Sequence, residues 1–137
     1  MAAGNDHWLW RLDAAAWLRA ADTELQAGDA NVGSRRTAVT HARRAAGMAL
    51  NAVLTTLSDG ETRWGRSYLE HLQALVRAPK PLPEAAKAAA ASLVAISPVA
   101  PPGLVTLSRG PHAAADEALA AARVIVDACA ASVRGAV

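Results

Sequence analysis

The final stretch of this 137-residue chain carries an unbroken apolar repeat. The repeat alternates spacings of four and three residues, through Ala115, Leu119, Ala122, Val126, Cys129 and Val133. Such spacing puts every member on one face of an α-helix, and a continuous apolar face has to be buried against neighbouring helices. The repeat therefore predicts a long last helix, opened by Pro111, on the seam of a helical bundle.

The composition favours the same class of fold. Hydrophobic residues make up 53% of the chain but aromatic residues only 4%, with no Phe, so most apolar side chains are small and permit close helix packing. Val, Ile and Thr do not gather in alternating runs, which argues against strands. We expect one domain, residues 1–137, with an all-α fold: an antiparallel four-helix up-and-down bundle with a short additional helix.

Two long helices are expected in the first half of the chain. The first is capped by Asn5 or Asp6, stops at Gly28 and has an apolar stripe formed by Trp10, Ala14, Trp17, Ala21 and Leu25. The second is capped by Ser34 and runs to about Leu57, with a stripe formed by Val39, Ala42, Ala46, Ala49, Val53 and Leu57. Gly47 lies inside this second helix, where it indicates a close helix crossing or a partner surface.

Another helix is expected from Pro83 to Ile96, after a connector rich in proline. Its inward positions are Ala86, Ala89 or Ala90, Leu93 and Ile96. The region from residue 88 to 108 has no charged residue, but prolines and a glycine interrupt it, so we expect no membrane-spanning helix.

Several classes of protein are disfavoured by what the sequence lacks. Cys129 is the only cysteine, so no internal disulfide can form, and its place on the apolar repeat predicts a buried, inert thiol. Asp6 and His7 stand where a signal peptide would need basic and then apolar residues, so a cytoplasmic protein is expected. The four histidines are scattered and no Gly-rich phosphate loop is present, so we expect neither a metal nor a cofactor.

The distribution of charge is more informative than the net charge of +2. Between residues 35 and 77, seven arginines face three acidic residues. The candidate phosphate or RNA contacts in and beyond this region are Arg43, Arg44, Arg63 and Arg109. The alternative is a solvated basic face that binds nothing, because charge runs on helices usually face water.

A short additional helix is predicted from Tyr68 to about Arg77. Ser67 followed three residues later by Glu70 is a capping-box pattern, which makes Ser67 the N-cap. Arg66 and His71 then occupy the two positions whose side chains meet across a capped helix start, beside unpaired N–H groups and the positive end of the helix dipole. This corner is suited to a phosphate; alternatively, Arg66 pairs with a nearby glutamate and His71 is a partly buried structural residue.

Three segments of the chain resemble the HEPN superfamily of small helical domains associated with nucleotide and RNA chemistry. Residues 45–54 are similar to the family's long second helix, residues 70–75 to its His-containing third helix, and residues 108–109 with 118–126 to its last helix. Arg66 and His71 match the R-x(4–6)-H motif of the ribonuclease members. Gly47-Met48 departs from the family pattern, since many relatives carry a Glu-Lys step there.

The resemblance implies a homodimer in which the motifs of two protomers form a metal-independent ribonuclease site. Arg66 would hold the scissile phosphate and His71 would move the proton as the 2′-hydroxyl attacks. A toxin with a cognate partner protein is one such role. The alternative from a different class is a non-catalytic dimerisation or protein-interaction module.

Overall fold

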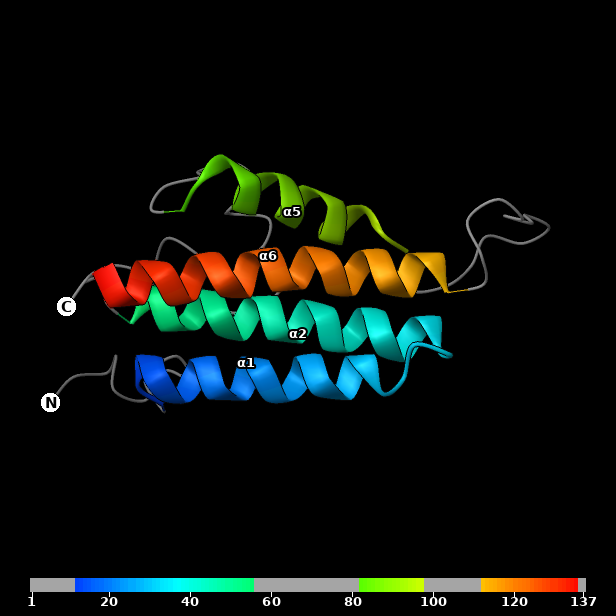
Figure 1. Ribbon diagram of the computed structural model, residues 1–137, viewed down its shortest axis with the longest axis horizontal. Helices are drawn as coiled ribbons and strands as arrows, with labels where there is room; N and C mark the ends of the chain where they lie inside the picture. Colours follow the sequence, from blue (N-terminus) through cyan, green and yellow to red (C-terminus); the bar gives the residue numbers. More distant parts are fainter. Residues whose placement is uncertain (1–11, 56–81, 98–111, 136–137) are drawn as a thin grey trace, which may run out of the picture.

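The computed structural model describes residues 12–55, 82–97 and 112–135, and within them the chain is helical with no strand. The helices are α1 (Ala14–Asp29), α2 (Arg35–Leu54), α5 (Glu84–Ala95) and α6 (Ala113–Gly135). The predicted all-α helical bundle is therefore confirmed (Figure 1). The expected short helix from Tyr68 to Arg77 lies outside the described residues.

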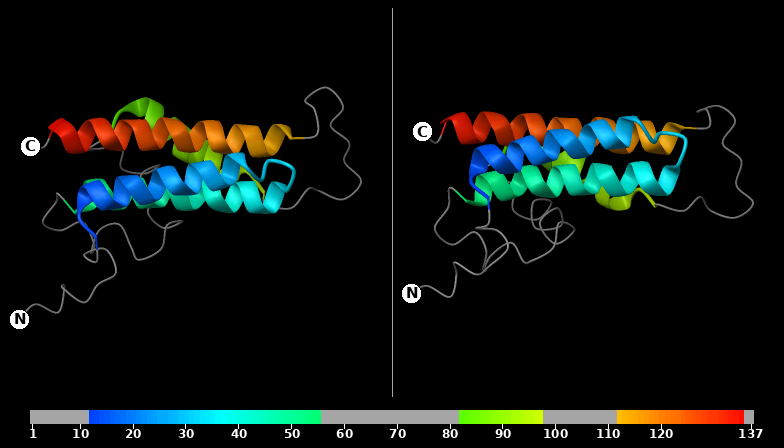
Figure 2. Two further views of the ribbon diagram at one scale, coloured as in Figure 1. Left: turned by 60° about the horizontal axis from the view of Figure 1, so that its bottom comes forward. Right: turned by 90° about the horizontal axis from the view of Figure 1, so that it is seen from below.

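The helix α2 occupies the centre of the bundle. It packs against α1 and α6, while α5 lies mainly along α6 and touches α2 at fewer places (Figures 1 and 2). The colours in Figure 1 show α1 and α5 running in one direction and α2 and α6 in the other. Because a short turn joins α1 to α2, these two helices form an antiparallel pair.

The helix α1 begins later than the sequence pattern predicted. Asp13 is its N-cap, with extended backbone angles and a side-chain Oδ1 that accepts from the backbone N–H of Ala16 at 2.8 Å. One continuous helix from Asn5 or Asp6 to Gly28 is therefore wrong, because Asp13 interrupts it. Trp17, Ala21 and Leu25 are buried as predicted, and Trp10 lies outside the described residues.

Gly28 was predicted to end α1, but the helix continues through Asp29 to a C-cap at Ala30. Gly28 is buried instead, and a Cβ built on it would lie 2.6 Å from Leu119 Cδ2 and 3.3 Å from His41 Cβ. The missing side chain thus lets the last turn of α1 approach α2 and α6 closely.

The helix α2 begins where the sequence predicted. Ser34 is its N-cap, and the Ser34 Oγ accepts from the backbone N–H of Thr37 at 3.3 Å. Five of the six predicted stripe residues are described and all five are buried, and from Ala45 to Leu54 only Met48 is not fully buried. The end predicted at Leu57 lies outside the described residues; the described helix ends at Leu54 with Thr55 as C-cap.

The helices α5 and α6 also confirm the predicted inward faces. Pro83 is the N-cap of α5, Ile96 follows its last turn and is half-buried, and the buried residues are Ala86, Ala89, Ala90 and Leu93. The predicted repeat of α6 is buried from Ala115 to Cys129, and Val133 is half-buried. None of the described helices combines the length and the apolar character needed to cross a membrane.

Candidate functional site

Four of the six predicted site residues lie outside the described residues: Arg63, Arg66, His71 and Arg109. Their roles stay predictions. Arg43 and Arg44 lie on α2, and their surroundings can be described.

Arg43 binds the C-terminal end of α5. Its Nη2 donates to the backbone oxygens of Ile96 at 2.6 Å and Val94 at 3.2 Å, and its Nε donates to the backbone oxygen of Leu93 at 3.3 Å. The last carbonyls of a helix have no partner within the helix, so a guanidinium placed there satisfies them and complements the helix dipole. Burial lowers the pKa of Arg43 from its ordinary value. Arg43 therefore has a structural role that its position in the sequence did not indicate.

Arg35 reinforces this connection from the first turn of α2. Its Nε donates to the backbone oxygen of Ser97 at 2.7 Å, directly beyond α5. Arg35 and Arg43 together tie the end of α5 to the first half of α2, although the helix α5 packs mainly on α6.

Arg44 belongs to a second cluster, between α1 and α2. Glu24 forms an ion pair there with Arg44, whose Nη2 lies 3.4 Å from Glu24 Oε2, and Glu24 Oε1 lies 2.7 Å from His41 Nδ1. The side chain of Glu24 is 14% exposed, that of His41 22% and that of Arg44 47%. Glu24 is thus held inside the helix interface, whereas the Arg44 guanidinium reaches the surface.

The cluster of Glu24, His41 and Arg44 was not found from the sequence. Glu24 and His41 are 17 residues apart and come together only because α1 and α2 are antiparallel. A carboxylate at Nδ1 fixes the orientation of an imidazole and leaves Nε2 for another partner. No group of three potential metal ligands occurs among the residues that the structure describes.

Two further polar side chains of α2 differ from their neighbours. Arg36 is exposed and forms no hydrogen bond or ion pair in the described part of the chain. Asn51 is fully buried, and neither its Oδ1 nor its Nδ2 has a hydrogen-bond partner there. Because most buried polar groups are paired, Asn51 stands out as an energetically unfavourable residue in the core.

Cys129 of α6 is buried in the apolar core, as the apolar repeat predicted. Burial raises the pKa of its thiol, because the thiolate would be poorly solvated. A thiol in this environment is inert, so Cys129 is not a candidate nucleophile.

Comparison with known proteins found no matching family model, no matching curated protein and no matching solved structure. The resemblance to the HEPN superfamily therefore depends on the residues quoted for it. Two of its segments fall within described helices: residues 45–54 in α2 and residues 118–126 in α6.

Proposed function

We propose that this chain is a HEPN-like protein that binds the phosphate of RNA or of a nucleotide through Arg66 and His71. The observation that carries the proposal is the packing of α2 against α6 at the centre of the bundle, since these helices contain residues 45–54 and 118–126. These two segments, quoted for the resemblance, are helical and mostly buried. Two of the segments quoted for the resemblance thus lie in helices that pack against each other, which supports the proposal, while residues 70–75 lie outside the described residues.

In the catalytic form of the proposal, the protein is a metal-independent ribonuclease and a cytoplasmic homodimer. His71 accepts the proton of a 2′-hydroxyl, whose oxygen attacks the adjacent phosphorus. The bond from phosphorus to the 5′-oxygen breaks, and the proton is delivered to that oxygen. Arg66 stabilises the negative charge that develops on the phosphoryl oxygens.

Purified wild-type protein, Arg66→Ala and His71→Ala test this proposal on total cellular RNA in the presence of EDTA. Wild type should cleave the RNA, and each variant should lose on the order of a hundredfold or more in rate. Far-UV circular dichroism should show that the variants keep their helix content. Cleavage at equal rates in all three proteins, or in none, would remove the catalytic proposal.

A non-catalytic interaction module is the second candidate, and the contacts of α2 favour it. Arg43 binds α5 and Arg44 binds Glu24, so two predicted RNA contacts already have partners within the protein. Binding to a partner protein through apolar contacts would change little with salt, whereas phosphate binding weakens steeply as salt rises. Sedimentation measures whether the wild-type protein is a dimer under either candidate.

A further inference from the structure

The four arginines in the first half of α2 have two different environments. Arg35 and Arg43 donate to the backbone oxygens at the end of α5. Arg36 is exposed without a hydrogen bond or ion pair in the described part of the chain, and 47% of the Arg44 side chain is exposed. Arg36 therefore offers a guanidinium without a partner among the described residues, and the Arg44 guanidinium, although paired with Glu24, also reaches the surface.

Arg36, Thr40 and Arg44 follow one another at intervals of four residues, and all three are exposed. Residues four apart are neighbours on a helix surface, so these side chains form one row about 12 Å long. We call Arg36, Thr40 and Arg44 the basic row. The row has two guanidinium groups, which only donate hydrogen bonds, with a neutral hydroxyl between them, and none of its three side chains is negatively charged.

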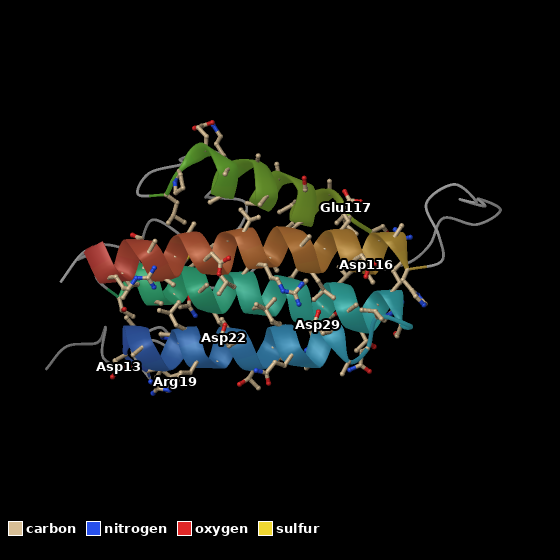
Figure 3. All side chains as sticks on the ribbon, in the orientation of Figure 1. Asp13, Arg19, Asp22, Asp29, Asp116 and Glu117 are labelled. Atoms are coloured by element: carbon tan, nitrogen blue, oxygen red, sulfur yellow. The ribbon has the colours of Figure 1, made fainter. Side chains whose placement is uncertain are left out.

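Two acidic residues of the neighbouring helix α1 have ion-pair partners, one on α6 and one on α2. Asp29 forms an ion pair with Arg123 of α6, and Asp22, seven residues earlier, shares that side of α1 (Figure 3). Glu24 alone reaches toward α2, where His41 and Arg44 share it. Among the described residues, one carboxylate is paired with the basic row, which carries two guanidinium groups.

We propose that the basic row binds the phosphate backbone of single-stranded RNA. Guanidinium groups bind phosphate oxygens with short, charge-assisted hydrogen bonds, and a Thr hydroxyl donates to the same oxygens. The length of the row lets one strand contact it at more than one phosphate. This inference rests on the proposed function, and it adds Arg36 and Thr40 as contacts that the basic pattern alone did not single out.

The test measures the binding of a fluorescein-labelled oligouridine of about 20 nucleotides between roughly 50 and 200 mM salt. For a single strand, each phosphate contact adds about 0.7 to the slope of log K against log salt. Arg36→Gln with Arg44→Gln should lower that slope by about 1.4 and weaken binding roughly twentyfold near 0.1 M salt. Thr40→Arg should raise the slope by about 0.7.

The matched control is Arg19→Gln with Arg134→Gln, which removes the same charge from exposed positions on α1 and α6. Figure 3 shows Arg19 on the outer side of α1, away from α6. The control should bind the oligouridine like wild type, and circular dichroism should show equal helix content in all the proteins. Arg36→Gln alone removes no hydrogen bond or ion pair among the described residues, so circular dichroism should show the helix content of wild type.

If wild type binds the oligouridine and the two double variants behave alike, the basic row is not the contact and the proposed function still stands. If wild type does not bind, RNA binding fails and the inference fails with it. Polyglutamate is tested as a competing polyanion. If wild type binds polyglutamate as tightly as the oligouridine, the proposal that the basic row binds RNA is wrong, and an acidic protein is the indicated partner.

Discussion

Replacing Arg43 by Ala should measurably loosen α5. Arg43 forms one short hydrogen bond to Ile96 at 2.6 Å and two longer ones, to Val94 at 3.2 Å and Leu93 at 3.3 Å. A hydrogen bond from a charged group contributes about 1.5–3 kcal/mol, and we assign the lower end of that range to the short bond alone. With about 0.5 kcal/mol for each longer bond, the variant should lose roughly 2.5 kcal/mol of unfolding free energy.

Urea unfolding followed by far-UV circular dichroism measures this loss. In a domain of this size, the midpoint of thermal unfolding should fall by roughly 10 °C. Arg43→Lys keeps the charge but not the planar fork, so it should lose about half as much. Hydrogen exchange should accelerate first in the last turn of α5, because those carbonyls lose their partner.

Arg36→Ala is the matched control, since Arg36 is an exposed arginine on the same helix and should change stability by less than about 0.5 kcal/mol. If Arg43→Ala and Arg36→Ala prove equally stable, or if exchange in α5 is unchanged, then the contacts to α5 do not hold that helix in place. The structural role assigned to Arg43 would then be refuted.

Three further substitutions probe the interior. Gly28→Ala should cost about 1 kcal/mol net, because the new Cβ meets Leu119 while Ala favours the helix; Gly33→Ala, with nothing within 4 Å, is the control for urea unfolding. Above roughly pH 8.5 the Cys129 thiol should ionise only in the unfolded chain, so the wild type should lose about 1.4 kcal/mol of stability per pH unit. Cys129→Ala should not show this loss. Urea titrations at several pH values measure the difference, and equal pH dependence in the two proteins would contradict the prediction. Asn51→Leu should stabilise by about 1 kcal/mol, as it removes an unpaired buried amide, whereas a lower urea midpoint would show that the amide has a favourable partner.

The helices that the sequence predicted best are those whose signals are local. Ser34 is an N-cap because its own hydroxyl accepts from Thr37, three residues away, and the apolar repeat of α6 depends only on helical periodicity. The start of α1 was misplaced because Asp6 and Asp13 are both acceptable caps, and no local rule chooses between them. The role of Gly28 was predicted wrongly for a similar reason, since the need for a residue without a side chain there comes from Leu119, far along the chain.

The candidate site was harder to predict because the contacts of its residues are made with residues distant in the sequence. Arg43 meets carbonyls 50 or more residues away, and Glu24 meets His41 from another helix. Residue type and charge show that α2 is basic, but they carry no information about which guanidiniums are already engaged. That information comes from the placement of α5 and α1.

Adjacent arginines on α2 differ because each residue turns the helix by about 100°. That turn places Arg35 and Arg43 beside the end of α5 and leaves Arg36 and Arg44 on the surface. If the basic row does not bind RNA, then three of these four arginines still have a partner within the fold, whereas Arg36 has none among the described residues. Substitution of Arg36 therefore distinguishes the two interpretations of this helix face. RNA binding should weaken if the face binds a ligand, and should not change if the face is only solvated.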